Sequence, residues 1–236
     1  AANPVTKAVA LVILVGCIGI FMWQGVWFAS EYESFVGQKK IAAKNYEGAI
    51  KNLSAALALY PANTEAGFRL GQVYLMQQRY KESLKALEKS LAAASYYEEV
   101  YYQAALAALG TKDTKKAVHY LMDNLRLHPY HLQAYSLLAT LLQENSIYAG
   151  TDELAMLERG LVLFPYEPNL WRQTGEIFQK QGDVEYAKDI YVRGLAVDTT
   201  DRKLLKRVEQ LYPASQRPPL VEQAKSLQAY QEKATK

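Results

Sequence analysis

The sequence is poor in the residues that build disulfide and metal frameworks. It contains one cysteine, Cys17, and 3 histidines among 236 residues. A single cysteine excludes an internal disulfide and every metal site made of several cysteines. Basic and acidic residues nearly balance at 27 and 24, and the net charge of +3 gives no electrostatic reason to expect nucleic-acid binding. With 13 glycines and 8 prolines between long stretches of helix-forming residues, the composition argues against an all-β fold.

Motifs that carry catalytic chemistry are missing as well. The chain has no G-x-x-x-x-G-K-S/T phosphate loop, no H-E-x-x-H zinc motif and no C-x-x-C-H haem site. His128 and His131 flank Pro129, but no cysteine and no obvious carboxylate lies near them in sequence, so we interpret them as turn residues. We expect that the protein is not an enzyme and that it uses neither a cofactor nor a metal.

One long apolar run stands near the start of the chain. Residues 8–28 carry no charged side chain, and a helix of that length reaches roughly 31 Å, enough to cross a bilayer. The run ends in an aromatic belt of Trp23, Trp27 and Phe28, which suits the headgroup region. We predict that residues 1–29 form an N-terminal tail and a transmembrane helix.

A lipoprotein signal is the alternative for the same run, because residues 14–17 (Leu-Val-Gly-Cys) are similar to a lipobox with Cys17 as the acylated residue. The residues after Cys17 stay apolar, which favours the membrane span. The flanking charges predict its orientation: Lys7 precedes the run, whereas Glu31 and Glu33 follow it. We expect a single-pass membrane protein with the N-terminus inside and the rest of the chain periplasmic or otherwise extracytoplasmic.

The remainder of the chain repeats with a period of 34 residues. The first two copies share Gly37 with Gly71 and Tyr46 with Tyr80, and a leucine recurs at 53, 87 and 121. The last copy contains a large residue, glycine, aromatic, alanine, aromatic and small residue in order: Trp171, Gly175, Phe178, Ala187, Tyr191 and Gly194.

This pattern resembles the tetratricopeptide repeat. The resemblance implies an all-α fold, a right-handed helix-turn-helix solenoid of about five repeats over residues 30–201. We place the repeats at 30–63, 64–97, 98–131, 132–167 and 168–201, with two extra residues between Tyr148 and Asp152. The departures are Lys40, where an aromatic is usual, and Ser95, where a closing proline is usual. We expect small residues at Gly37, Gly71, Ala105, Ala139 and Gly175 to let paired helices approach closely.

The ends of such a stack need caps. At the N-terminal end the transmembrane helix covers the stack, and Ser30 with Glu33 makes a capping box that predicts a helix start directly after the span. At the other end, residues 202–213 are predicted to form a capping helix, with Leu204, Leu205, Val208 and Leu211 on one face. Residues 214–236 are interpreted as a proline-broken linker and a terminal amphipathic helix with a stripe of Leu220, Ala224, Leu227 and Tyr230. That helix folds back on the stack, docks on a partner or is mobile.

Function in the family that the chain resembles is recognition, because the first helix of each repeat lines a groove for a peptide or a partner helix. The positions that match the centre of this groove are Glu65, Phe68, Gln72, Met76, Glu99, Tyr102 and Leu106. The groove of the fifth repeat is matched by Asn169, Arg172 and Glu176. We expect Phe68 and Tyr102 to be half exposed there, whereas Tyr101 and Trp171 are expected to be buried.

The apolar groove centre with acids on its rim suits an apolar segment with basic flanks. Relatives that clamp the terminal carboxylate of chaperones have basic residues and Asn where this chain has Ser34, Gln38, Glu99 and Gln103, which argues against that role. Two hypotheses follow. The first is a membrane-anchored interaction scaffold or adaptor, used in assembly of a bacterial envelope machine. The second is a permanent structural subunit of a large membrane complex. In both, the partners are proteins, either membrane proteins or their peptides, together with the lipid bilayer at residues 8–28.

Overall fold

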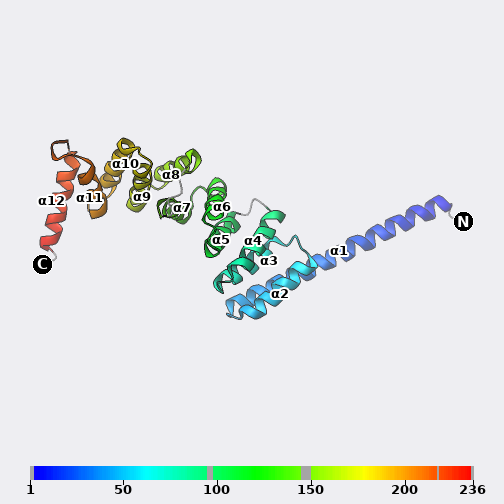
Figure 1. Ribbon diagram of the computed structural model, residues 1–236. Helices are drawn as coiled ribbons and strands as arrows, with labels where there is room; N and C mark the ends of the chain where they lie inside the picture. The colour runs from blue at the N-terminus through cyan, green and yellow to red at the C-terminus, as the bar shows by residue number, and fades with distance from the viewer. Residues whose placement is uncertain (1–2, 95–97, 145–149, 217, 235–236) are drawn as a thin grey trace. The chain divides into compact units, whose positions relative to one another are not determined.

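Regular secondary structure is helical throughout the described part of the chain. The computed structural model describes residues 3–94, 98–144, 150–216 and 218–234, and Figure 1 shows the helices in chain order. The expected all-α class is confirmed. Ser95 and the loop at Tyr148, both named above, lie outside the described residues.

The chain divides into two compact units, Ala1–Asp113 and Thr114–Lys236. The first contains α1 (Pro4–Ala42), α2 (Tyr46–Leu59), α3 (Thr64–Met76), α4 (Tyr80–Ala93) and α5 (Glu98–Gly110). The second contains α6 (Thr114–Leu127), α7 (Leu132–Glu144), α8 (Thr151–Leu163), α9 (Pro168–Lys180), α10 (Val184–Val197), α11 (Arg202–Leu211), a short 3-10 turn (Ala214–Gln216) and α12 (Pro219–Ala234). Helices α3, α5, α7 and α9 begin at the first residues predicted for repeats two to five.

The core of the first unit is built from small and aliphatic residues of neighbouring helices. Ala49, Leu53 and Ala56 of α2 are fully buried, and they form one cluster with Ala66, Leu70 and Val73 of α3. These residues recur every three or four positions, so each helix turns one apolar face inward. The same neighbours pack in order along the chain, α1 on α2, α2 on α3, α3 on α4 and α4 on α5.

Glycines mark the closest approaches between paired helices. A Cβ atom added to Gly37 would lie 2.7 Å from Leu53 Cγ, and one added to Gly71 would lie 2.5 Å from Leu87 Cγ. In the second unit the matching position, Gly175, faces the ring of Tyr191 at 2.5 Å. Real Cβ atoms do not approach other atoms so closely, so a side chain here would push the helices apart. The predicted role of these three glycines is confirmed.

Helix α1 runs without a break through the apolar run and into the first helix pair (Figure 1). The predicted capping box at Ser30 and Glu33 is therefore wrong, because a cap needs a helix start and the backbone at Ser30 is already helical. Both side chains instead make tertiary contacts. Glu33 accepts a short hydrogen bond from Asn52 of α2, and Ser30 is buried against the end of α2.

A buried polar cluster fixes α1 to the turn between α2 and α3. The Ser30 hydroxyl donates to the backbone oxygen of Ala56 at 2.9 Å. Asn63 Nδ2 donates to Ser30 Oγ at 2.9 Å and to Glu31 Oε1 at 3.1 Å. The same Asn63 caps α3, since its Oδ1 accepts from the backbone N–H of Ala66 at 2.9 Å. One side chain thus satisfies a helix N-terminus and holds α1 in place.

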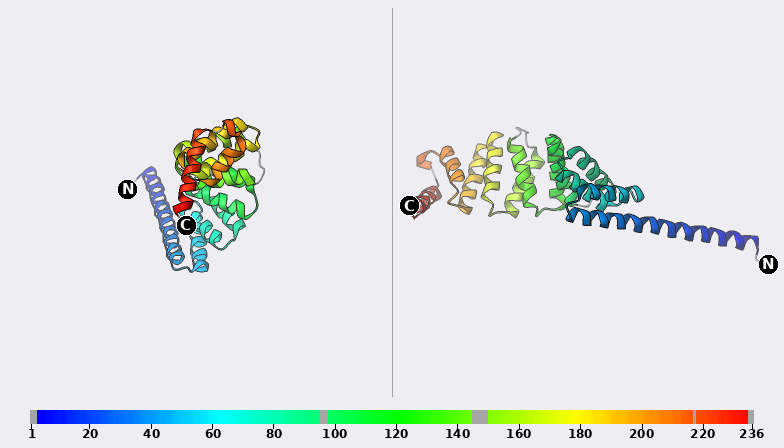
Figure 2. Two further views of the ribbon diagram at one scale, coloured as in Figure 1. Left: turned by 90° about the vertical axis from the view of Figure 1, so that its left-hand side faces the viewer. Right: turned by 90° about the horizontal axis from the view of Figure 1, so that it is seen from below.

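In the second unit the helices stack side by side (Figure 2). The largest fully buried side chains are aromatic and aliphatic: Tyr135, Leu138, Leu157, Leu170, Ile190, Tyr191 and Leu195. Helix α11 buries Leu204, Leu205 and Val208, as predicted for the capping helix. Its N-terminus is capped by Asp201, whose Oδ1 accepts from the backbone N–H groups of Lys203 and Leu204.

The last helix folds back onto its own unit. Helix α12 packs against α10 and α11, with Val221 and Ala224 fully buried. Lys225 Nζ lies 2.7 Å from Glu209 Oε1 of α11, which adds an ion pair beside the apolar contact. Among the alternatives given by the sequence, docking on the stack is the one observed. Leu227 and Tyr230 of the predicted stripe lie outside the residues whose side chains are described.

We expect Asn63→Ala to destabilise the first unit strongly. The variant loses a helix cap worth about 1 kcal/mol and two further hydrogen bonds in a buried setting, so the loss should reach about 2–3 kcal/mol. The matched control is Asn45→Ala, because Asn45 caps α2 through the N–H of Gly48 at 3.0 Å in an exposed turn. Thermal melts by circular dichroism compare the two, and equal melting temperatures would refute the role of Asn63.

Candidate functional site

The residues predicted to line the groove lie on α3 and α5 of the first unit. Met76 is 59% exposed, Glu99 is exposed, and Gln72, Tyr102 and Leu106 are partly exposed. Burial raises the pKa of the Tyr102 hydroxyl above its usual value, so this side chain is already partly withdrawn from water. These side chains leave an accessible apolar surface with an acidic residue, Glu99, beside it.

Phe68 departs from the prediction, because its side chain is only 1% exposed. The guanidinium of Arg69 lies 5.3 Å from the centre of the Phe68 ring, and Arg69 is itself held by Glu65 at 2.7 Å and by Gln72 at 3.1 Å. The position of a residue on a helix predicts the direction in which its side chain points. It does not predict how much of that side chain its neighbours shield from solvent. Phe68 is therefore part of the core and not a half-exposed groove residue.

The two aromatics expected to be buried differ from one another. Trp171 is 9% exposed, and its indole N–H donates to the backbone oxygen of Pro165 at 2.9 Å. Tyr101 is only partly buried, like Tyr102 beside it. The expected burial of Tyr101 is therefore wrong, whereas Tyr102 is half-buried as expected.

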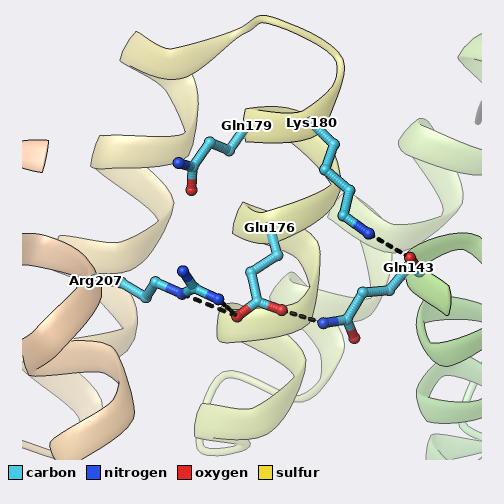
Figure 3. A pocket seen from close by; sticks show the side chains of 5 residues that line it. All are labelled: Gln143, Glu176, Gln179, Lys180 and Arg207. Atoms are coloured by element: carbon cyan, nitrogen blue, oxygen red, sulfur yellow. Dashed lines mark hydrogen bonds and ion pairs between the residues drawn. The ribbon is translucent and has the colours of Figure 1, made fainter. Parts of the chain in front are cut away.

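The second unit contains a polar cleft centred on Glu176 of α9. The side chain of Glu176 is 6% exposed, which is unusual for a carboxylate without a dense set of partners. Arg207 of α11 donates to Glu176 Oε1 through Nε at 3.0 Å and through Nη2 at 2.7 Å. Gln143 of α7 donates a short hydrogen bond to Oε2 (Figure 3). Three helices therefore meet at one carboxylate.

Two cavities open beside this carboxylate. One has a volume of about 450 Å³ and is lined by Gln143, Glu176, Gln179, Lys180 and Arg207 (Figure 3). The other has a volume of about 330 Å³ and is lined by Arg172, Glu176, Lys203, Lys206, Arg207 and Gln210. Both share Glu176 and Arg207, so they form neighbouring parts of one cleft. Volumes of this size are typical of ligand sites.

The cleft is strongly basic. Five cationic side chains line it, Arg172, Lys180, Lys203, Lys206 and Arg207, whereas Glu176 is the single carboxylate among the lining residues. Arg172 is poorly satisfied: its contacts with the Glu176 oxygens are 3.4 Å long, and its Nε is buried without a hydrogen-bond partner. The Lys180 ammonium donates to the backbone oxygen of Gln143.

The phenol of Tyr191 lies next to this charge cluster. Burial, reinforced by the negative charge of Glu176, raises the pKa of Tyr191 far above its usual value, so the hydroxyl stays protonated. It donates to Gln179 Oε1 at 3.0 Å, which orients one of the cleft amides. The arrangement offers fixed donors and cations to a ligand, and it positions no nucleophile beside a base.

The sequence predicted some of the residues that line this cleft, but not the others. Arg172 and Glu176 are two of the groove positions matched in the fifth repeat. Lys203, Lys206 and Arg207 belong to the predicted capping helix, for which the sequence indicated no binding role, and all three line the cleft. Gln143, Gln179 and Lys180 carried no sequence signal, because ordinary polar residues on a helix surface give no sign of which helix will face them.

The histidine pair has a structural explanation. The rings of His128 and His131 are 5.5 Å apart, and His131 Nδ1 lies 2.8 Å from Oδ1 of the buried Asn124. Burial, with a smaller contribution from His128, lowers the pKa of His131. Within the described residues, no group of three or more His, Cys, Asp or Glu side chains is placed to hold a metal.

Comparison with known proteins supports the repeat over part of the chain and shows the fold. The sequence profile of the tetratricopeptide repeat matches residues 40–109. No protein with a curated functional description matches the chain. Among solved structures, a MamA protein is similar with a TM-score of 0.60 and 19% identity, covering 74% of this chain and 94% of that one.

Two further solved structures are similar in fold. YrrB, described as a tetratricopeptide repeat protein with an unusual peptide-binding site, is similar with a TM-score of 0.60 and 17% identity over 74% of this chain and 89% of YrrB. MamA from Desulfovibrio magneticus RS-1 has a TM-score of 0.55 and 15% identity, covering 74% of this chain and 97% of that protein. At these identities the likeness shows a shared fold of stacked helix pairs.

Glu176→Ala should destabilise the second unit by about 2–4 kcal/mol, because it leaves two guanidinium groups and an amide without their shared acceptor in a buried cluster. The control is Glu185→Ala on α10: this carboxylate is 84% exposed and pairs only with Lys188 at 2.7 Å, so its loss should cost well under about 1 kcal/mol. Thermal melts measure both, and a Glu176→Ala variant that melts with the control would contradict the assignment.

Proposed function

We propose that this chain, built of tetratricopeptide-type helix pairs, is a scaffold that binds protein partners and is anchored in a membrane by α1. The observation that carries the binding role is the open cleft around Glu176, a preformed site with fixed donors and no catalytic arrangement. The partly exposed side chains on α3 and α5 supply a second candidate surface. Stacked helix pairs present such surfaces because each pair buries only the faces that meet its neighbours.

The proposal of a membrane anchor rests on the first half of α1. This helix contains one stretch long and apolar enough to cross a membrane, and none of that stretch is buried inside the protein. Phe21 is 74% exposed, Val12 is 71% exposed and Trp23 is 60% exposed. Large apolar side chains left in water along a whole helix are unfavourable, so a lipid environment accounts for them better than solvent does.

An aromatic stripe continues beyond the apolar run on the same helix. Phe28, Tyr32 and Phe35 recur every three or four residues and are 64%, 65% and 53% exposed. The ammonium of Lys39 lies 4.5 Å from the centre of the Phe35 ring and ends the stripe with a positive charge. Aromatic rings followed by a lysine suit the headgroup layer, where one end of a side chain is apolar and the other is wet.

We further propose that the partners are membrane proteins or their peptides, met during assembly of a bacterial envelope machine. The N-terminus would lie inside and the helix pairs in the periplasm, as the charges flanking α1 predict. A permanent structural subunit of a large membrane complex is the second candidate. An uninterrupted α1 favours it, because a rigid connection between the apolar run and the helix pairs suits a structural brace. Purification distinguishes the two: a subunit keeps fixed stoichiometry with its partners, whereas an adaptor releases them.

The membrane proposal is tested in cells. The chain should stay with the membrane pellet after alkaline carbonate extraction, and protease added to intact spheroplasts should digest the helix pairs. Introducing Ile18→Lys in the middle of the apolar run should weaken the anchoring, since a lysine at the centre of a span costs about 2.5–3.5 kcal/mol. A cytoplasmic marker controls for lysis. Extraction into the supernatant would refute the anchor, and protection from protease until lysis would reverse the orientation.

The groove surface is tested by the double variant Met76→Ala with Tyr102→Ala. Tagged chains are purified from membranes in mild detergent, and partners are quantified by mass spectrometry. Both side chains are at least partly exposed, so the melting temperature should change little while partner recovery falls roughly tenfold.

The matched control is Val162→Ala with Tyr166→Ala, which removes an apolar and a tyrosine side chain that are 78% and 83% exposed in the second unit. It should keep every partner. If the Met76 and Tyr102 variant also keeps every partner, the groove assignment on α3 and α5 is wrong.

A further inference from the structure

We propose that the cleft around Glu176 binds an acidic, extended segment of a partner protein, whose carboxylates pair with Arg172, Lys203, Lys206 and Arg207. The proposal deepens the binding function given above and depends on it. It also makes the second unit selective for charge of the opposite sign to the basic-flanked segment expected on α3 and α5.

The charge of the cleft is the first argument. One carboxylate, Glu176, stands against five cationic side chains, so the lining keeps a net charge of about +4 at neutral pH. The other carboxylate of α11, Glu209, pairs with Lys225 of α12. A cleft lined mainly by charges of one sign raises the local concentration of groups of the opposite sign, so this cleft attracts anionic groups.

Incomplete pairing inside the cleft is the second argument. Arg207 has close contacts with Glu176 at 2.7 and 3.0 Å, whereas Arg172 makes contacts of only 3.4 Å with the same carboxylate. Distances of 3.4 Å are at the outer limit of a hydrogen bond. The buried Nε of Arg172 has no partner at all. A guanidinium in this state has unused donors, and a ligand carboxylate is the acceptor that best fits their planar arrangement.

The spacing along α11 is the third argument. Lys203, Lys206 and Gln210 line the cleft at intervals of three and four residues, so they form one row on the helix. The rise from the first to the last is roughly 10 Å. Side chains on one face of an extended peptide recur every ~7 Å, between the rise of ~4.5 Å from Lys203 to Lys206 and the ~10 Å of the whole row, so the long lysine side chains can reach two alternate acidic residues. A segment with Asp or Glu at every second position is therefore the ligand that fits.

The test uses the full chain in detergent micelles and a fluorescein-labelled, acetylated and amidated peptide of alternating Ala and Glu. Fluorescence anisotropy should show saturable binding that weakens with added salt. The same peptide with Gln for Glu should not bind. A third peptide, with Gln and a free carboxyl end, separates side-chain carboxylates from a chain terminus, and binding of this third peptide alone would overturn the proposal.

The decisive variant is Lys203→Gln with Lys206→Gln, because both side chains are exposed and their loss should leave the melting temperature unchanged. It should weaken binding of the Glu peptide roughly five- to tenfold. The control, Lys115→Gln with Lys116→Gln on α6, makes the same change in net charge away from the cleft. Equal weakening by both variants, or no binding of the Glu peptide to the unaltered chain, would refute the proposal.

Failure here is distinguishable from failure of the binding function. If partners still co-purify through α3 and α5 while the acidic peptide does not bind, the scaffold role stands and the charge selectivity of the cleft is wrong. If the unaltered chain recovers no partner at all, the proposed function itself fails.

Discussion

Close approach of paired helices is the constraint on which the rest of the structure depends. Leu53 lies over Gly37, Leu87 over Gly71 and Tyr191 over Gly175, each within the space that a Cβ atom would need. Because these contacts bring the two helices of a pair together, each pair gains one continuous apolar face for the next pair. This stacking also sets the distance between the first helices of neighbouring repeats. The exposed surfaces between them, including the cleft at Glu176, depend on that distance.

The periodic part of the fold could be predicted from sequence because its determinants are local. A small residue, glycine or alanine, recurs about once every 34 residues, and the observed helix starts at Thr64, Glu98, Leu132 and Pro168 agree with the repeats placed from it. The predicted start at Ser30 was wrong for a physical reason. Ser-x-x-Glu satisfies a helix end only where the preceding residues leave the helix, and here the apolar run is itself an excellent helix former. The Ser-x-x-Glu motif favoured a helix start at Ser30, whereas the preceding apolar residues favoured continuing the helix, and the helix continues.

The candidate sites depend on distances that no local pattern encodes. Glu176, Gln143 and Arg207 lie on three helices, and their meeting requires the crossing of those helices to be known. The position of Arg172 and Glu176 followed from the repeat, whereas the role of Lys203 and Lys206 did not, since an exposed lysine has the same sequence signature on any helix. Burial of Phe68 was missed because a helix position predicts only the direction of a side chain, whereas packing leaves this ring 1% exposed.

The continuity of α1 has a mechanical consequence. A single continuous helix connects the apolar run to the first helix pair. Asn63 holds it there through hydrogen bonds to Ser30 and Glu31. We expect a change in the tilt of the apolar half to move α2 and α3 with it, because the helix is continuous and is hydrogen-bonded to Ala56 and Asn63 at its entry into the first pair. The orientation of the first unit therefore follows the orientation of α1. A mechanical force on the apolar half of α1 would be transmitted to α2 and α3, and a force on those helices would be transmitted back.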